Sequence, residues 1–301
     1  MVMKFNKKTL VIVIILAITG IWIYFNEDTS SNNHELFKLA DYPTEINGYT
    51  VGLETFGIKG LNDPIDWFCL IYISKDGKRI FESETGMRIF GYGVDEYIEN
   101  ADDIKTDLLK DYDKDGVPEI AFSTFSGGAH CCSNQYVIEL SNPISIMLDL
   151  STESTGVSFI DLNKDGIMEI STADGVFDYW HSGYSTSHRP KVILSLQDGK
   201  YKPDPKYMIS PAPTDNELMV KVQEFKDSEK IFGGDSSGTW NYVLDLIYSG
   251  NIKSAQKYVD LVWDINGKSG DFKTKENFWK ELDDEIRSSS YYDDLSNFLN
   301  L

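Results

Sequence analysis

A short acidic segment that occurs twice constrains this chain more than any other feature. The first copy, DYDKDGVPEI, begins at Asp111, and the second, DLNKDGIMEI, begins at Asp161, fifty positions later. In both copies oxygen-bearing side chains stand at positions 1, 3 and 5, and glycine stands at position 6. These oxygens can converge on one point only if the backbone turns sharply, which glycine permits at little steric cost. Each copy is therefore predicted to form a tight loop.

The spacing of these oxygens is typical of a loop that binds a hard divalent cation. The backbone carbonyl of position 7 would add a ligand, and the glutamate at position 9 would close the shell directly or through water. Ca²⁺ fits better than Mg²⁺, which demands stricter octahedral geometry and keeps its waters. The alternative is a pair of acidic turns that hold no metal. The predicted ligands are Asp111, Asp113, Asp115, Val117 and Glu119 in the first loop, and Asp161, Asn163, Asp165, Ile167 and Glu169 in the second.

The residues around each loop indicate strands and not helices. A helical calcium hand requires an acid at position 12, where this chain has Phe122 and Thr172. Phe159 and Ile160 precede the second loop, and short β-branched or aromatic runs follow both loops. We therefore expect each loop to join two strands.

The pattern D-x-[DN]-x-D-G-x-x-[DE] between strands, repeated at this period, resembles the FG-GAP/VCBS repeats of integrin-α-like β-propellers. The likeness covers roughly residues 100 to 180, and no clean Phe-Gly pair precedes either loop at the family's distance. At about 40 to 50 residues per blade, the β region holds about three blades, fewer than the usual four to eight or so. The resemblance thus implies a partial or divergent propeller. It also implies calcium bound by Asp111, Asp113, Asp115 and Glu119, and by Asp161, Asn163, Asp165 and Glu169.

The chain is predicted to be α+β, with a mainly antiparallel, propeller-like β domain over residues 45–210 and a small helical domain over residues 211–301. Asp76-Gly77 and Asp198-Gly199 lie between β-rich runs and predict two hairpins. Thr214 and Glu217 form the capping box of a first helix. Apolar residues at helical spacing predict an antiparallel helix pair and two further helices, and we interpret these stripes as core: Trp240, Val243, Leu244 and Ile247; Ile252, Ala255, Val259 and Val262; Phe278, Leu282 and Ile286; Leu295, Phe298 and Leu299.

The N-terminus has the pattern of an export signal or membrane anchor. Three lysines within residues 1–8 precede an unbroken apolar run over residues 9–25. We favour an uncleaved transmembrane anchor with residues 1–8 in the cytoplasm, followed by a polar linker over residues 26–44. This predicts a membrane-anchored protein whose main part is extracytoplasmic, either periplasmic or at the cell surface, and secreted if the segment is cleaved.

Charge and cysteine content narrow the classes of partner and chemistry. A formal net charge of −20 disfavours nucleic acid as a partner. Cys69 could pair with Cys131 or Cys132, or the two neighbouring cysteines could pair with each other. His130 beside these cysteines leaves a thiolate nucleophile or a zinc site open as alternatives, but no third orienting residue is evident.

We therefore predict a calcium-binding, membrane-anchored module with a non-enzymatic binding or adhesion role, and we assign no catalytic residue. Its ligand would be a protein or a carbohydrate. The aromatic cluster Phe177, Tyr179, Trp180, His181 and Tyr184 could stack on such a ligand or fill a core. The alternatives are an exported hydrolase acting on a cell-surface polymer and an accessory component of an envelope complex that docks through the helix pair.

Overall fold

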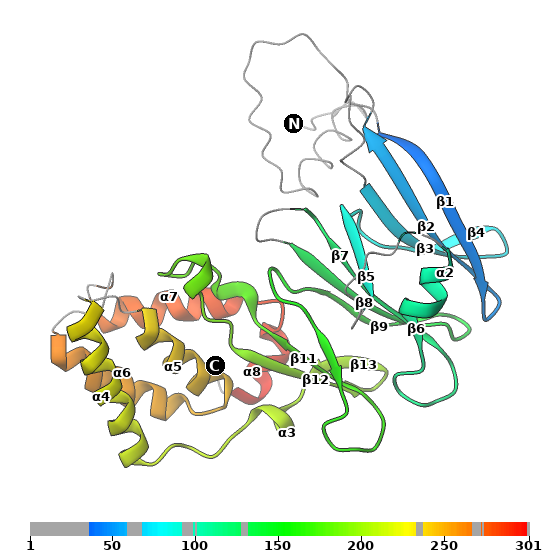
Figure 1. The fold of residues 1–301 in the computed structure, drawn as a ribbon. Coiled ribbons are helices and arrows are strands. Elements are labelled where there is room, and N and C mark those ends of the chain that lie inside the picture. Colours follow the sequence, from blue (N-terminus) through cyan, green and yellow to red (C-terminus); the bar gives the residue numbers. More distant parts are fainter. Residues whose placement is uncertain are drawn as a thin grey trace, which may run out of the picture. The chain divides into compact units, whose positions relative to one another are not determined.

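The computed structural model describes residues 36–58, 68–91, 99, 101–127, 132–232, 237–266, 272 and 274–299. The chain divides into two compact units, Met1–Ser151 and Thr152–Leu301. The first unit contains two antiparallel β-sheets, and the second contains one antiparallel sheet and a helical region (Figure 1). The predicted α+β class, with antiparallel sheets followed by C-terminal helices, is confirmed. The described residues form three sheets that do not close into a propeller.

The first sheet of the first unit is a meander of four strands in sequence order. The strands are β1 (Leu36–Ile46), β2 (Tyr49–Ile58), β3 (Phe68–Lys75) and β4 (Lys78–Glu82). Asp76 and Gly77 join β3 to β4 with φ angles of 50° and 72°, so the predicted hairpin is confirmed. Both residues are left-handed, as a two-residue turn that follows the twist of the strands requires.

The expected linker over residues 26–44 ends earlier in the structure, because residues 36–44 belong to β1. The strand forms because Asn47 and Gly48, with φ angles of 49° and 78°, turn the chain back onto β2. The Asn-Gly pair is a hairpin signal in the sequence, but the polar residues before it led to the prediction of a linker instead of a strand. Residues 26–35 lie outside the described part of the chain.

The second sheet of the first unit has the order β5-β7-β8-β9, and a short strand β6 also pairs with β7. A helical turn, α2 (Ala101–Asp103), and a π-helical turn, η1 (Ile104–Leu108), precede β6. The strands are β5 (Arg88–Gly91), β6 (Leu109–Lys110), β7 (Glu119–Phe125), β8 (Ser133–Glu139) and β9 (Ser145–Ser151).

One hydrophobic core joins the two sheets of the first unit. Side chains from both sheets and from η1 form a single buried cluster, as expected for sheets that pack face to face. Its fully buried members include Val51, Leu53, Ile71, Ile73, Ile89, Ile104, Leu108, Ile120, Phe122 and Ile138. This core holds the beginning of β7, which carries the last predicted ligand of the first loop.

The sheet of the second unit is a meander of β10 (Ser158–Ile160), β11 (Glu169–Ala173), β12 (Lys191–Gln197) and β13 (Lys200–Pro203). Asp198 and Gly199 join β12 to β13 with φ angles of 51° and 74°, which confirms the second predicted hairpin. Two 3₁₀ turns, η2 (Gly175–Phe177) and η3 (Tyr184–Thr186), lie between β11 and β12.

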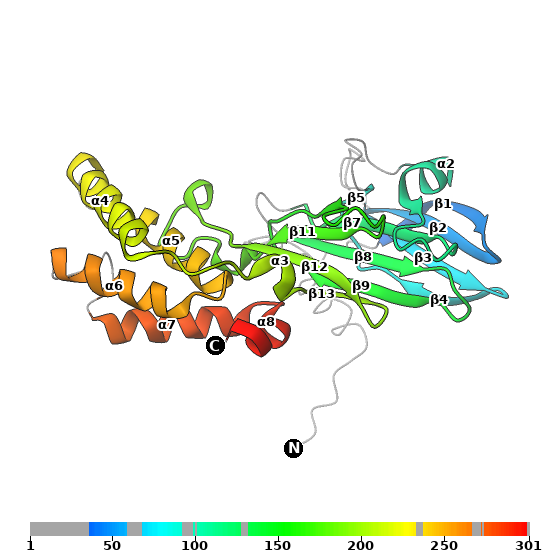
Figure 2. The ribbon, with the colours of Figure 1, turned by 90° about the horizontal axis from the view of Figure 1, so that it is seen from below.

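The helical region begins with the short helix α3 (Pro205–Met208), and α4 to α8 follow it (Figure 2). The capping box is confirmed: the Thr214 amide donates to Glu217 at 2.6 Å, and the Glu217 amide donates to the Thr214 hydroxyl at 3.3 Å. The predicted apolar stripes are core, since all of their residues except Ile252 and Phe298 are buried. The helices are α4 (Asp215–Phe232), α5 (Ser237–Tyr248), α6 (Ile252–Asn266), α7 (Lys275–Ser288) and α8 (Tyr292–Leu299).

Within the described residues, every helix is too short or too polar to cross a membrane. The expected anchor at residues 9–25 lies outside these residues.

Candidate metal centre

The first acidic loop joins β6 to β7 and is shaped by its own aspartates. The Asp115 amide donates to Asp113 Oδ1 at 3.1 Å, and the Val117 amide donates to Asp115 Oδ1 at 2.7 Å. The Gly116 amide donates to Asp111 Oδ2 at 3.2 Å, and Gly116 has a φ of 90°. These local bonds hold the loop in the tight turn that its glycine was expected to permit.

Glu119 enters the same loop from the first position of β7. It is completely buried, and its Oε2 accepts a hydrogen bond of 2.5 Å from the Tyr112 amide. Its other oxygen, Oε1, is also buried and has no hydrogen-bond partner among the described residues. A buried carboxylate oxygen without a partner is costly, so this atom indicates that a group is to be bound here.

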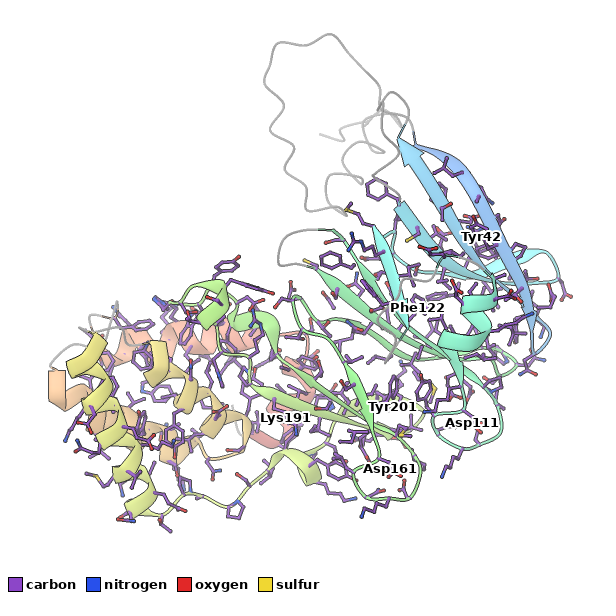
Figure 3. The ribbon with its side chains drawn as sticks, viewed as in Figure 1. Tyr42, Asp111, Phe122, Asp161, Lys191 and Tyr201 are labelled. Carbon is purple, nitrogen blue, oxygen red and sulfur yellow. The ribbon has the colours of Figure 1, made fainter. Side chains whose placement is uncertain are left out.

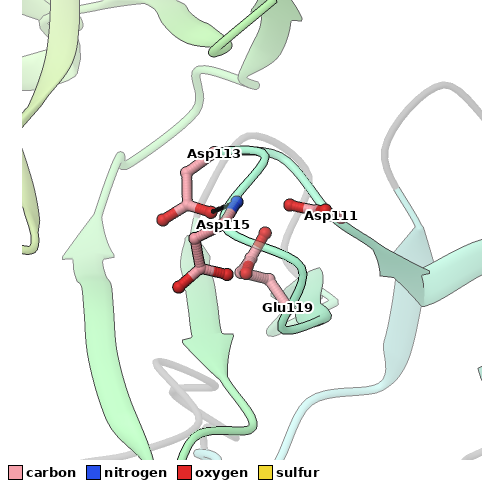
Figure 4. A group of neighbouring side chains, drawn as sticks. All are labelled: Asp111, Asp113, Asp115 and Glu119. Atoms are coloured by element: carbon pink, nitrogen blue, oxygen red, sulfur yellow. Dashed lines mark hydrogen bonds between the residues drawn. The ribbon is translucent and has the colours of Figure 1, made fainter.

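The four acidic side chains of the first loop come together in the structure (Figure 4). Each of Asp111, Asp113, Asp115 and Glu119 offers an oxygen, and these oxygens all lie within 4.8 Å of one another. No lysine or arginine in the described part of the chain forms an ion pair with any of them. The loop therefore gathers four carboxylates against one lysine, Lys114, which forms no ion pair with them in the described structure.

This arrangement is reflected in the protonation equilibria of the loop. The pKa of Glu119 is raised to about 8: burial is the main cause, the charges of the three aspartates act in the same direction, and the hydrogen bond from Tyr112 opposes them. Burial also raises the pKa of Asp113, and the hydrogen bond from the Asp115 amide offsets part of this rise. A bound cation would reverse these effects by favouring the charged carboxylates.

The residues fit a hard cation. The four side chains that converge in the loop offer carboxylate oxygens, one of them buried and without a partner in the described structure, and this ligand set suits Ca²⁺ or Mg²⁺ better than metals that prefer nitrogen or sulfur. Val117 follows Gly116 in the loop, at the position predicted to offer its carbonyl. The structure thus supports an acidic centre that could hold a metal ion, and the identity of the ion stays a prediction.

The second loop repeats the first almost bond for bond; Figure 3 marks the first residue of each, Asp111 and Asp161. It joins β10 to β11, and the Gly166 amide donates to Asp161 Oδ2 at 3.0 Å. The Asp165 amide donates to Asn163 at 2.9 Å, and the Ile167 amide donates to Asp165 at 2.8 Å. The duplication in sequence is therefore a duplication in backbone hydrogen bonding, and both loops join strands as expected.

The second loop differs from the first in its side chains. The Asn163 amide group donates to Asp165 Oδ2 at 2.8 Å. Glu169 is 4% exposed, and its Oε2 accepts from the Leu162 amide, as Glu119 does from Tyr112. Its Oε1 accepts from the hydroxyl of Tyr207 at 2.9 Å, and the unpartnered buried oxygen of this loop is Asp161 Oδ1.

Sequence reasoning missed Tyr207, which follows Glu169 by 38 residues. No motif connects the two, because the contact exists only once β13 and α3 have folded back against the loop.

The cysteine alternatives are narrowed by the structure. Cys69 is a free thiol and buried, so it forms no disulfide with Cys131 or Cys132. Burial raises the pKa of Cys69 to about 12, which leaves it protonated and unreactive at neutral pH. Cys132 is disulfide-bonded, whereas His130 and Cys131 lie outside the described residues.

The aromatic cluster after the second loop is divided between core and surface. Phe177 is 1% exposed and packs against Trp180 and Tyr248, with ring centroids 5.7 and 6.1 Å away. Tyr179 is 56% exposed, has a φ of 63°, and lies 5.6 Å from the ring of Tyr184. Phe177 therefore fills the core, and Tyr179 is presented on the surface.

No family model matches the chain, and no solved structure matches it. It is similar to a probable thylakoid lumen protein of Synechocystis sp., with 35% identity over 99 residues. The similarity covers 31% of this chain and 28% of the Synechocystis protein, so the chain spans less than a third of that relative's length.

Proposed function

We propose that this protein is a calcium-binding module of the FG-GAP/VCBS type with a non-enzymatic role in binding or adhesion. The observation that carries the proposal is Glu119 Oε1, a completely buried, unpartnered oxygen that lies among three aspartates. Ca²⁺ would be held by Asp111, Asp113, Asp115 and Glu119, with the Val117 carbonyl and water completing the shell. The ion would balance the four carboxylates, whose charge exceeds that of the loop's one lysine, Lys114.

Two of the three antiparallel sheets are four-stranded meanders, and this also supports the resemblance, because propeller blades are sheets of this kind. In this proposal the sheets are divergent blades, and the calcium loops fix the entry to β7 and β11. Calcium is then mainly structural. A cation that binds the folded state alone stabilises it by about 2.7 kcal/mol at a hundredfold excess over the dissociation constant.

We place the protein outside the cytoplasm, held by residues 9–25 as a membrane anchor. The apolar run and its preceding lysines support this placement, as does the similarity to a probable thylakoid lumen protein. Extracytoplasmic fluids hold enough Ca²⁺ to fill a site whose dissociation constant is on the order of 0.1 to 1 mM. The partner would be a protein or a carbohydrate, and the exposed Tyr179 beside Tyr184 offers an aromatic surface for it.

The test is calorimetric titration of Ca²⁺ into the chelator-treated full-length chain, together with thermal melting. We expect heat of binding and a rise in melting temperature. Glu119→Gln, which keeps the size and one oxygen acceptor but removes the charge, should abolish the contribution of the first loop to both. Asp198→Asn is the matched control, since it lies in a hairpin turn that belongs to neither loop and its positive φ suits asparagine. Absence of both heat and thermal shift in the unmodified chain would contradict the proposal.

A further inference from the structure

Each acidic loop leaves one buried carboxylate oxygen without a partner in the described structure, Glu119 Oε1 in the first loop and Asp161 Oδ1 in the second, so the loops differ in which acid is left open. Glu119 and Glu169 both give Oε2 to a backbone amide of their own loop, at 2.5 and 2.8 Å. Glu119 Oε1 has no partner, whereas Glu169 Oε1 accepts the Tyr207 hydroxyl at 2.9 Å. The first glutamate is left open to a cation, and the second is already satisfied by the protein.

Through its hydrogen bond with Lys206, Tyr207 also links a positive charge to the second loop. The Lys206 ammonium donates to the Tyr207 hydroxyl oxygen at 2.9 Å. Lysine, tyrosine and glutamate thus form a chain of hydrogen bonds that ends on the carboxylate. A hydrogen bond to a charged carboxylate is stronger than one between neutral groups, so a cation would have to overcome a strong bond to displace the Tyr207 hydroxyl from Glu169.

The position of Tyr207 is fixed by the fold. It lies in α3, whose first turn is capped by Asp204: the Lys206 amide donates to Asp204 Oδ1 at 2.8 Å. Asp204 is held in turn by β12, since its amide donates to the Ile193 carbonyl and Ser195 donates to its other oxygen at 2.7 Å. The backbone that carries Tyr207 is therefore held in place by hydrogen bonds to Asp204 and, through Asp204, to β12.

We propose that Tyr207, supported by Lys206, takes the place of a cation at Glu169, so that the second loop binds Ca²⁺ much more weakly than the first. The inference rests on the proposed function of the first loop. An entering cation would have to displace the hydroxyl from Glu169 and would meet the lysine charge. Asn163, which stands where the first loop has Asp113, removes one negative charge and so acts in the same direction.

The test isolates the second loop by disabling the first. Ca²⁺ is titrated calorimetrically into the full-length chain carrying Glu119→Gln, with and without Tyr207→Phe. Removing the competing hydroxyl frees a buried carboxylate oxygen, and we expect the affinity of the second loop to rise about tenfold. Tyr292→Phe is the matched control, because its hydroxyl accepts only a surface hydrogen bond from Arg287, and it should leave the affinity unchanged.

Two results would overturn the inference: equal affinities of the two loops in the unmodified chain, or a change of less than about twofold on Tyr207→Phe. Should Tyr207→Phe fail to fold, Lys206→Met keeps the hydroxyl and removes only the charge, and we expect about a threefold rise. Failure of the proposed function appears separately, as loss of binding at the first loop in the unmodified chain.

Discussion

Both compact units bury a carboxylate, and they satisfy it by opposite means. In the first unit, Glu54 is 6% exposed and lies between two cations, with Lys38 at 2.6 Å and Arg79 at 2.7 Å. In the second unit, Asp174 is 2% exposed and receives only neutral donors. The cations near Glu54 stabilise its charged form. The neutral donors around Asp174 provide hydrogen bonds but no opposite charge.

The neutral donors to Asp174 come from distant parts of the second unit. The hydroxyls of Tyr248 in α5 and of Ser289 after α7 each donate to Oδ2 at 2.5 Å, and the Val176 amide donates to Oδ1 at 3.1 Å. Asp174 therefore connects the end of β11 to two helices. Burial nevertheless raises its pKa, and these hydrogen bonds offset only part of the effect.

The cationic partners of Glu54 lie on the outer face of the first sheet. Burial on its own would raise the pKa of Glu54, but the hydrogen bonds from Arg79 and Lys38 outweigh it and hold the pKa below its ordinary value. Arg79 also lies 4.1 Å above the ring of Tyr72, and that ring covers Gly52 of the neighbouring strand. A β-carbon at Gly52 would lie 2.3 Å from the ring, so only glycine fits beneath it.

The comparison explains why the first loop stands out. Glu119 is as buried as Glu54 and Asp174, yet one of its oxygens has neither a cation nor a dipole from the protein. The fold supplies partners for the other two acids, and so the missing partner at Glu119 is the strongest structural argument for an external ion.

The largest expected effect is at Asp174. Asp174→Ala would leave the Tyr248 and Ser289 hydroxyls buried without their acceptor, and we expect a loss of about 3 kcal/mol in the free energy of unfolding. Urea denaturation measures it, and Asp284→Ala, which removes an exposed partner of Lys280, is the control with little effect. A loss as small as that of the control would mean that the buried hydroxyls find other acceptors.

A smaller effect is expected at Arg79. Arg79→Ala would leave Glu54 with Lys38 alone and uncover the Tyr72 ring, and we expect a loss of about 1 to 2 kcal/mol, because the guanidinium is 37% exposed. The same denaturation assay measures it. The double variant Arg79→Ala, Glu54→Gln should recover part of this loss, since the uncompensated charge is then gone; no recovery would contradict the ion-pair explanation.

The two acids should also respond to pH with opposite signs. The depressed pKa of Glu54 contributes stability that is present above about pH 4.5 and is lost as the pH falls through its folded pKa. The raised pKa of Asp174 contributes stability that is present below about pH 3.8 and is lost as the pH rises through its folded pKa. The loss in free energy of unfolding caused by Glu54→Gln should therefore become smaller as the pH is lowered. The loss caused by Asp174→Asn should become smaller as the pH is raised toward neutral. Denaturation of both variants across this range is the measurement, and slopes of equal sign would break the comparison.

The smallest effect is expected at Lys38, whose side chain is 43% exposed and shared between Asp41 and Glu54. Lys38→Met keeps the aliphatic stem and removes the charge, and we expect a loss of about 0.5 kcal/mol. The loss should decrease further in high salt, which urea denaturation in added sodium chloride would detect. A loss larger than that of Arg79→Ala would show that the ranking of the two cations is wrong.

Much of the fold follows from short sequence patterns. The Asp76-Gly77 and Asp198-Gly199 turns, the Thr214 to Glu217 capping box and the apolar helix stripes all form as predicted, because each depends on residues a few positions apart. The strand over residues 36–46 was not predicted. The inward residues Tyr42, Thr44 and Ile46 do alternate with exposed ones, but the segment is too polar to stand out, and pairing with β2 defines it as a strand.

The sequence by itself determined the two loops: the aspartates, the glycine and the glutamate lie within nine positions, and they make the same backbone hydrogen bonds in both copies. Only the tertiary structure decided which glutamate oxygen stays open. Glu169 meets Tyr207 across 38 residues, Asp174 meets Ser289 across 115, and Glu119 meets no such partner. Local geometry is set by neighbours along the chain, whereas the partner of a buried oxygen is set by which distant elements pack against it.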